Sequence, residues 1–337
     1  MRATVHDVAA RAGVSLTTVH RALNGNGYVQ KETRRKVIDA ANAVNYRPNA
    51  VAQSLRRQRT GMLGHLVHTI YPNPFFACVA GGVEDRAREL GFATVTCNTH
   101  GSAEAETDYV ELLLRQRSDG IIFTCPRSLD NVRHVQQNGV PVSVIERPKG
   151  LQHVDVVLAD NRTGAYNAVR HLLDLGHRTI AYIGGALKDT VEVERFEGYC
   201  QAFAASGMER DDALTYFPGV QCADGYSAMA QVLQRPKRPS AVFVASDMAA
   251  MGALQALGRQ GLTVPQDMSL VGFDDTLGAV ASPPLTTVAL PMWEMGAAAV
   301  DLILRRTGAE PASPAQCIVL DTRLVLREST GSAITES

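Results

Sequence analysis

The chain has 337 residues, of which 45% are hydrophobic and 20% are charged, and its formal net charge is −1. A chain of this size and composition can bury a large core, and we expect two or three domains. No apolar run is long enough to span a bilayer, and the first residues lack the pattern of a signal peptide. These features favour a cytoplasmic protein with no membrane partner.

The cysteines and histidines give no sign of a metal or redox site. Six cysteines are widely spaced without a Cys-x-x-Cys pair, which argues against a zinc or disulfide framework and predicts small buried thiols in a reducing compartment. His65 and His68 lie three residues apart on one expected strand, so they should point to opposite faces. We therefore expect no metal, no cofactor and no catalytic residue. The cysteines are Cys78, Cys97, Cys125, Cys200, Cys222 and Cys317.

Basic residues are concentrated at the start of the chain. The first 60 residues hold eleven Lys and Arg against three Asp and Glu, whereas the other 277 hold 22 against 31. The head therefore has a formal charge of +8 and the body one of −9. A small basic head on an acidic body predicts a surface for a polyanion such as nucleic acid, separate from a second activity.

The head begins with two short helices. Thr4 and Asp7 form a capping box, and the helix that they open should end at Gly13, where glycine permits a tight turn. Ser15 caps a second helix, from Leu16 to about Leu23. Two short helices joined by so few residues are typical of a helix-turn-helix.

The second helix of such a motif enters the major groove of DNA. Leu16, Thr17, His20 and Arg21 lie at helical spacing on one outward face. Arg21 can donate paired hydrogen bonds to a guanine, Thr17 offers a hydroxyl group, and Leu16 can pack on a thymine methyl group. The alternative is a solvated face of an ordinary helical hairpin, but the charge of the head favours DNA.

A third helix should span about Lys31 to Asn45 and bury Val37, Ile38, Ala41 and Val44. Its cations should contact phosphates and set the register on DNA. These cations are Lys31, Arg34, Arg35 and Lys36.

A short, weakly helical segment follows the third helix. Pro48 ends that helix, and Asn49 can cap the next one. A helix of one or two turns is marginal in water, so this segment should fold only when a partner subunit and DNA contribute packing.

Strand-like and helical stretches alternate through the rest of the chain. Such alternation predicts parallel sheets with helices on both faces, and two series of elements predict two lobes. The first series has strands at 62–68, 92–97, 120–124 and 142–145 and helices at 77–90 and 103–117; the second has strands at 179–183, 241–245 and 269–273 and helices at 163–175, 197–205 and 248–260.

Ligands of parallel sheets bind beyond the carboxyl ends of the strands. Carboxylates at those positions can accept hydrogen bonds from hydroxyl groups, arginines can donate them, and a phenylalanine can face a sugar ring. This chemistry fits a neutral polar ligand. Residues that follow strands are Asn73 to Phe76, Glu146-Arg147, Ser246-Asp247 and Asp274-Asp275.

Each of these residues also has a purely structural interpretation. Asp247 and Asp274 could cap the elements that follow them or, less simply, form the acid/base pair of a glycosidase. Because Phe75 and Phe76 are sequential, we expect only one of them to face the pocket. Residues 160–161 should open a helix and brace the cleft.

Distinctive strings of residues run through both parts of the chain. The head contains DVAARAGVSLTTVHRALNG, GYV, ETRRKV, NYRPNAVAQSL and RQRTG, and the body contains NPFFACVAGGVEDRARELGF, DNRTGAYNAVRHLLDLGHRTIAYIGG, ERFEGY, AVFVASDMAAMGALQALGRQGLTVPQDMSLVGFDD and PPLTTV. Over roughly residues 3–328, the chain resembles the lactose-repressor (LacI) family of bacterial regulators.

The resemblance implies a homodimer whose hinge helices reach the minor groove, with Leu55 as an apolar wedge that kinks the duplex. It also implies a two-lobed body like that of sugar-binding proteins, and it assigns ligand contacts to Arg195 and Asp247. Three positions depart from the family pattern. His20 stands where serine is usual, Gln53 replaces an arginine, and Glu146 replaces an aspartate, which alters the expected shape of the ligand pocket.

We therefore expect an all-α helix-turn-helix domain with a hinge helix, followed by an α/β two-lobed body of the periplasmic-binding-protein type. The expected bounds are 1–47 for the DNA-binding domain, 48–60 for the hinge and linker, 61–330 for the body and 331–337 for a tail; the lobes comprise about 61–159 with 291–317, and 160–290 with 318–330. DNA contacts are expected from Thr4, Ser15, Leu16, Thr17, Thr18, His20, Arg21, Asn24, Tyr28, Arg34, Asn49, Ala52, Gln53, Leu55 and Arg56, and effector contacts from Asn73, Phe75, Phe76, Glu146, Arg147, Arg195, Ser246, Asp247 and Asp274.

The sequence thus predicts a ligand-controlled transcription regulator, most simply a repressor, and not an enzyme. As a dimer it should bind a near-palindromic operator in double-stranded DNA and respond to a small effector, with a sugar or polyol favoured over a purine. The end of the chain has no heptad pattern, which argues against a coiled-coil tetramer. The alternatives are a sugar-binding transport protein, disfavoured by the missing export signal and the basic head, and a sugar-processing enzyme.

Overall fold

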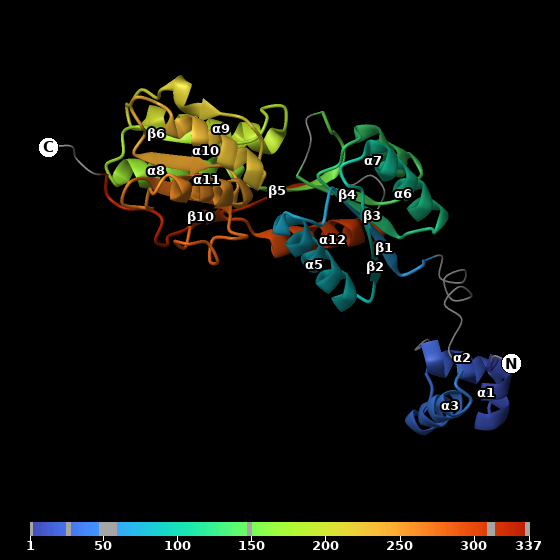
Figure 1. The fold of residues 1–337 in the computed structure, drawn as a ribbon. Coiled ribbons are helices and arrows are strands. Elements are labelled where there is room, and N and C mark those ends of the chain that lie inside the picture. Colours follow the sequence, from blue (N-terminus) through green and yellow to red (C-terminus); the bar gives the residue numbers. More distant parts are fainter. Residues whose placement is uncertain (1–2, 25–27, 47–58, 147–149, 309–313, 334–337) are drawn as a thin grey trace. The chain divides into compact units, whose positions relative to one another are not determined.

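The computed structural model describes residues 3–24, 28–46, 59–146, 150–308 and 314–333 (Figure 1). The chain forms two compact units, Met1–Thr60 and Gly61–Ser337, which we call the head and the body. Residues 48–58 of the expected hinge lie outside the described residues.

In its described residues the head contains α1 (Val5–Ala12), α2 (Leu16–Asn24) and α3 (Lys31–Ala43). Thr4 caps α1 through the expected capping box, and Gly13 ends the helix with a left-handed φ of 65°. Glycine adopts this conformation without the steric cost that a side chain would bring. The first two helices therefore follow each other through the short turn that the sequence predicts.

One valine from each helix fills the centre of the head. Val8, Val19 and Val37 are fully buried. The prediction that Ile38 is buried was wrong, since 43% of its surface is exposed, and Ala40 is buried in its place. Residues three and four apart share a helix face, whereas Ile38 is rotated by about 100° from its neighbour Val37.

The described part of the body contains two sheets, each with six strands (Figure 1). The first is built from β1 (Met62–Val67), β2 (Ala93–Asn98), β3 (Gly120–Thr124), β4 (Val142–Ile145), β5 (Asp155–Ala159) and β11 (Cys317–Leu320), and the second from β6 (Ile180–Ile183), β7 (Thr215–Tyr216), β8 (Ala241–Val244), β9 (Ser269–Asp274), β10 (Thr286–Ala289) and β12 (Arg323–Val325). The strand orders are β11-β5-β4-β3-β1-β2 and β12-β10-β9-β8-β6-β7. Of these pairs, only β10 with β12 is antiparallel.

Pairs of helices cover the sheets. In the first lobe they are α5 (Pro74–Glu89) with α12 (Met292–Gly308) and α6 (Ala103–Arg115) with α7 (Leu129–Gln137); in the second they are α8 (Asn161–Asp174) with α9 (Thr190–Ala205) and α10 (Cys222–Leu233) with α11 (Asp247–Arg259). A short 3-10 turn, Asp212–Leu214, precedes β7. All five residues of β3 are buried, as expected for a strand covered on both faces. No helix in the described ranges is long and apolar enough to cross a membrane.

The chain passes between the lobes three times, after β5, after β10 and after β11. The last strand of the first sheet, Cys317–Leu320, pairs with β5. The first lobe therefore extends to residue 320, beyond the expected boundary at 317, and β12 returns the chain to the second sheet. The boundary could not be located from the sequence because it depends on which distant strand each short strand pairs with.

The prediction that all six cysteines are buried was wrong. Cys97 is buried, but Cys78 and Cys317 are exposed. Cys78 lies on α5, whose buried stripe includes Phe75 and Val79, and its position on the helix turns it away from that stripe.

Part of the expected tail is attached to the second lobe. The buried ring of His177 lies 2.8 Å from the Ser240 hydroxyl and 3.0 Å from both the Ser269 hydroxyl and the Gly331 carbonyl oxygen. The Ala333 amide donates to the Leu175 carbonyl at 2.9 Å. The segment from 331 to 333 is thus fixed beside the amino ends of β8 and β9.

The contact between α5 and α12 leads to a first prediction. A Cβ atom at Gly82 would overlap the backbone of Trp293, whereas a Cβ atom at Gly81 would meet nothing within 4 Å. Gly82→Ala is therefore expected to lower the free energy of unfolding of the body by about 1–3 kcal/mol. Gly81→Ala, the matched control, should leave it unchanged or raise it by up to about 1 kcal/mol.

Urea unfolding followed by tryptophan fluorescence measures this effect, because Trp293 is the single tryptophan of the chain and reports on the body alone. Equal stability of the two variants would show that α5 and α12 do not pack as closely as described.

Candidate functional site

One face of α2 is accessible. Thr17 and Arg21 are exposed and Leu16 is 36% exposed, whereas Val19 on the opposite face is fully buried. His20 is half-buried beside Arg21. The structure thus brings the predicted base-reading side chains onto one surface of the head.

Ser15, Thr18 and Thr4 hold the starts of the first two helices. The Thr18 amide donates to Ser15 Oγ at 3.2 Å, and the two hydroxyl oxygens are 2.9 Å apart. In α1, the Thr4 amide donates to Asp7 Oδ2 at 2.8 Å and its hydroxyl donates to the same oxygen at 2.9 Å. These two bonds lower the pKa of Asp7. Such bonds satisfy amide groups that a helix start leaves free, so Thr4 fixes the start of α1, and Ser15 with Thr18 fixes the start of α2, whether or not they touch DNA.

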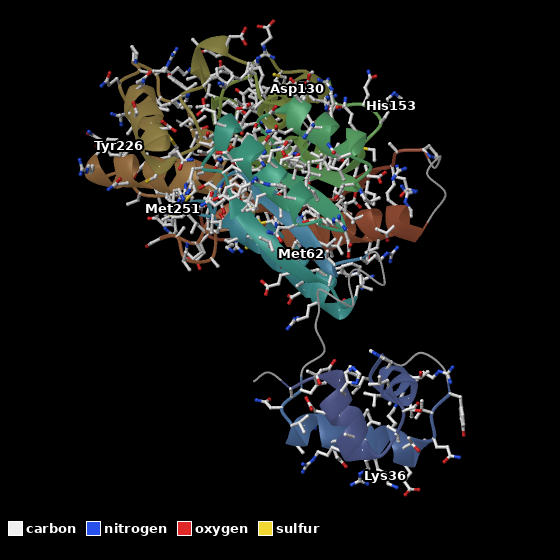
Figure 2. All side chains as sticks on the ribbon, turned by 90° about the vertical axis from the view of Figure 1, so that its right-hand side faces the viewer. Lys36, Met62, Asp130, His153, Tyr226 and Met251 are labelled. Atoms are coloured by element: carbon white, nitrogen blue, oxygen red, sulfur yellow. The ribbon has the colours of Figure 1, made fainter. Side chains whose placement is uncertain are left out.

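Further predicted DNA contacts lie around α2 and α3. Tyr28 is 90% exposed. Lys36, labelled in Figure 2, pairs with Glu32 at 3.5 Å on the surface of α3. Arg34 is half-buried, and its Nε has no hydrogen-bond partner among the described residues. Asn24 is the last residue of α2. Asn49, Ala52, Gln53, Leu55 and Arg56 lie outside the described residues.

A cavity of about 430 Å³ lies between the two lobes of the body. The first lobe contributes residues that follow β1, β3 and β4 and the start of α5, and the second those that follow β6, β7 and β8, the end of β9 and the start of α9. These are carboxyl ends of strands, where ligands of parallel sheets bind. The predicted effector residues that the structure brings into the lining are Asn73, Phe75, Phe76, Glu146, Arg195, Ser246 and Asp274.

Arg195 is buried in the wall of this cavity. Its Nε donates to Asn161 Oδ1 at 3.0 Å, its Nη1 donates to the Ala245 carbonyl at 2.6 Å, and its Nη2 lies 3.1 Å from Asp274 Oδ1. The guanidinium also lies 4.0 Å from the centre of the Phe273 ring. Contacts on several sides fix the group, and Asn161 acts as the brace that the sequence predicts.

Three buried carboxyl groups share this wall with Arg195. Glu146, Glu192 and Asp274 are each at most 7% exposed. Burial raises the pKa of Glu146 to about 7, because attraction to Arg195 and a hydrogen bond from the Ala159 amide offset it only in part. Burial also raises the pKa of Glu192 and of Asp274, again against the attraction of Arg195. A single guanidinium therefore does not compensate three ionised carboxylates.

Unusual backbone conformations gather at the cavity. Cys125, Glu146 and Asp274 all line it, and their φ angles are 54°, 58° and 107°. Non-glycine residues adopt positive φ at an energetic cost, and such residues are found preferentially at ligand and active sites. In each case the residue ends or follows a strand, and the turn directs its side chain to the cavity.

The lining also contains polar atoms without a partner. His68 Nδ1, Thr190 Oγ1 and Ser246 Oγ are buried, and no described residue forms a hydrogen bond with them. Buried polar groups are usually paired, so these atoms are the groups that a bound polar molecule would satisfy.

Phe75 and Phe76 both line the cavity, so the prediction that only one faces it was wrong. Their rings are arranged edge to face with centroids 5.2 Å apart. The Phe75 amide donates to Asn73 Oδ1 at 3.0 Å, which caps α5 just before Pro74. Because the cavity meets the end of the helix and not its side, two sequential side chains can reach it.

Asp247 does not line the cavity, contrary to its predicted role. It is fully buried; its Oδ1 accepts from the Thr287 hydroxyl at 2.7 Å and its Oδ2 accepts from the Leu277 amide at 3.2 Å. Burial raises the pKa of Asp247 to about 6. It braces the segment after β9 and does not cap the helix that follows it, because it is the first residue of α11 and its oxygens accept from Leu277 and Thr287. Arg147 lies outside the described residues.

Sequence reasoning missed Glu192 and His68 as lining residues. Glu192 lies three residues before Arg195 on α9, so the two share a helix face, and that spacing was the available signal. His68 directly follows β1, and the strand-end rule that selected Glu146 could have selected it too.

The comparisons with known proteins agree with both parts of the structure. Residues 4–49 match the family model "Bacterial regulatory proteins, lacI family", and residues 169–330 match a "Periplasmic binding protein-like domain". The HTH-type transcriptional regulator DegA of Bacillus subtilis (strain 168) is 38% identical over 335 residues, which cover 98% of each protein.

Two solved structures are similar over nearly the whole chain. The lac repressor dimer bound to operator and the anti-inducer ONPF has a TM-score of 0.86 at 28% identity, with 98% of this chain and 100% of that chain covered. A complex of the transcriptional regulator CelR with cellobiose has a TM-score of 0.75 at 33% identity, with 97% and 100% covered.

A helix-turn-helix head joined to a two-lobed binding body defines a ligand-responsive, DNA-binding transcription regulator and not an enzyme. The chain belongs to the LacI family of bacterial regulators.

Proposed function

We propose that this regulator represses transcription by binding a near-palindromic operator as a homodimer, and that a sugar or polyol in the cavity between the lobes controls its affinity for DNA. The observation that carries this proposal is the cavity itself. It combines two aromatic rings, buried carboxyl groups and unpartnered hydroxyl groups, which suit a molecule with many hydroxyl groups and apolar ring faces. The similar solved structures include a repressor dimer on its operator and a cellobiose complex, which supports the same view.

In this mechanism the exposed face of α2 enters the major groove, with Arg21 and Thr17 against base edges and Leu16 against a methyl group. The cations of α3 contact phosphates and make binding dependent on salt. Two heads related by the symmetry of a dimer explain why the operator should be near-palindromic.

The effector acts because it touches both lobes. Glu146 and Phe76 belong to the first lobe, and Arg195 and Asp274 belong to the second. A ligand that binds the closed arrangement more tightly than the open one shifts the population of lobe angles, and with it the arrangement of the heads.

Selection of bound duplexes from a random-sequence pool by the purified full-length protein tests the DNA part of the proposal. The expected result is a site with two inverted half-sites, together with a dimer in sedimentation experiments. Sugars, polyols and purines are then tested for their effect on affinity for the selected site. A selected site without inverted symmetry would contradict binding to a near-palindromic operator. A response to purines alone would contradict control by a sugar or polyol.

A substitution in α2 gives a second prediction. Arg21→Ala is expected to weaken binding to the selected operator by about 10- to 100-fold, which corresponds to the loss of one bidentate contact to a base. Its effect on random-sequence DNA should be much smaller. Fluorescence anisotropy with both duplexes at one salt concentration measures the difference.

Arg35→Ala is the matched control, because Arg35 is an exposed cation of α3 and predicted to contact phosphate. It should weaken binding to both duplexes by similar factors. If Arg21→Ala behaved in the same way as this control, Arg21 would not read a base.

A further inference from the structure

The buried wall of the effector cavity has an excess of negative groups. It contains the carboxyl groups of Glu146, Glu192 and Asp274 and the guanidinium of Arg195. The other charged lining residues, Arg127, Lys188 and Asp189, are exposed at the rim. Solvent and salt screen the rim charges, but they screen the buried ones much less.

Of the three carboxyl groups, Glu192 is held in place by a backbone amide and forms no ion pair, although Arg195 attracts it. Its Oε2 accepts a hydrogen bond from the Gly185 amide at 2.7 Å. A Cβ atom at Gly185 would lie 2.8 Å from Glu192 Cδ, so the close approach requires glycine at that position. In the described part of the chain, the ion pair of Arg195 is with Asp274, and Glu192 forms none.

Repulsion between carboxyl groups disfavours their joint ionisation unless a cation lies beside them. Burial and, to a smaller extent, repulsion by Glu192 raise the pKa of Asp274. Glu192 also lies in the first turn of α9, where the helix dipole favours an ionised carboxylate. Within the described ranges, no group of His, Cys, Asp and Glu residues is arranged to hold a metal ion.

A second observation indicates that a ligand is recognised here. The Ser246 hydroxyl lines the same cavity, Ser246 is only 2% exposed, and its Oγ has no hydrogen-bond partner among the described residues. Thr190, two residues before Glu192 on α9, is half-buried, and its buried hydroxyl oxygen also has no hydrogen-bond partner among the described residues. An ammonium group has three donors and no acceptor, and a carboxylate with hydroxyl oxygens supplies the acceptors that it requires.

We propose that the effector carries a cationic amine that pairs with Glu192, so that the sugar or polyol of the proposed function is an amino sugar or an amino polyol. The inference rests on that proposed function. The amine compensates the buried negative charge that Arg195 alone does not neutralise. Its hydrogen bonds to Glu192 are charge-assisted and therefore stronger than those of a hydroxyl group. Without such a ligand, the carboxyl group takes up a proton at higher pH than an exposed glutamate does, because burial raises its pKa.

Isothermal titration of the full-length protein with matched sugars tests the proposal. The probes are glucosamine, galactosamine and mannosamine, each with its parent hexose and its neutral N-acetyl derivative, at a pH where the amines are protonated. The expected result is that at least one amino sugar binds about tenfold or more tightly than both of its neutral counterparts, as the loss of a charge-assisted hydrogen bond predicts.

Two variants locate the effect. Glu192→Gln keeps the size of the side chain and should remove the preference for the amine while binding of the neutral sugars persists. Glu209→Gln is the control, since it makes the same replacement at an exposed position outside the cavity, and it should keep the preference to within about twofold. Thermal unfolding of both variants checks that the body is folded.

The outcomes separate the two proposals. Binding of parent hexoses as tightly as of amino sugars, or an unchanged preference in Glu192→Gln, overturns the pairing of an amine with Glu192 and leaves the sugar-controlled function standing. Binding of none of the sugars, together with a purine that binds and changes affinity for DNA, overturns the sugar class itself and the amine with it.

Discussion

Arg195→Ala is expected to lower the free energy of unfolding of the body by about 3–5 kcal/mol, the usual cost of removing one partner of a buried ion pair. Arg195 and Asp274 are 6% and 4% exposed, and the substitution leaves the Asp274 carboxylate without its guanidinium. It also removes the hydrogen bonds to Asn161 and Ala245 and the contact with the Phe273 ring. Urea unfolding followed by Trp293 fluorescence measures the loss.

Arg162→Ala is the matched control. Arg162 pairs with Glu197, but the two side chains are 54% and 46% exposed, so the loss should be about 1 kcal/mol or less. A double variant, Arg195→Ala with Asp274→Asn, should recover part of the stability because no buried carboxylate is then left unpaired. Similar losses from Arg195→Ala and Arg162→Ala would mean that the buried pair does not exist as described.

Glu146→Gln is expected to raise the free energy of unfolding of the body at about pH 8 by about 3 kcal/mol. The pKa of Glu146 rises from an ordinary 4.5 to about 7 on folding. Between these two values the folded protein holds a proton that the unfolded chain has lost. The contribution of Glu146 to the stability of the wild type is therefore fully present below pH 4.5, and it is lost as the pH rises through about 7.

Glutamine stays neutral at every pH, so the variant should lack this component of the pH dependence, and the two proteins should be equally stable below pH 4.5. Unfolding in urea at a series of pH values measures the difference curve. Glu209→Gln, which replaces an exposed side chain, is the control. The difference in stability between this variant and the wild type should not change with pH. A Glu146→Gln variant that is less stable than wild type at about pH 8 would show that the ionised carboxylate stabilises the fold.

Local patterns in the sequence predicted much of the fold. The capping box at Thr4, the turn at Gly13 and the start of α2 at Leu16 depend on neighbouring residues, and all three are as predicted. The strand–helix alternation likewise located β3 and β4 at the residues expected. Such features need no knowledge of distant contacts.

The interior of the cavity was less predictable, because it depends on how separate segments meet. The rule of strand ends selected Glu146 and Asp274 correctly as lining residues, but it also selected Asp247, whose partners Thr287 and Leu277 lie far along the chain. It gave no reason to consider Glu192, because that residue lies on a helix. Whether each of these residues contacts an effector stays a prediction.

The three passages of the chain between the lobes have a consequence for biosynthesis. β11, which completes the first sheet, and β12, which completes the second, lie within nine residues of each other near the end of the chain, at Cys317–Leu320 and Arg323–Val325. During translation, the 60 residues of the head can fold once they leave the ribosome, whereas neither lobe has all its strands until residues 317–325 have been made. Every newly made molecule thus passes through a period in which it has a finished operator-reading unit and an unfinished sensor.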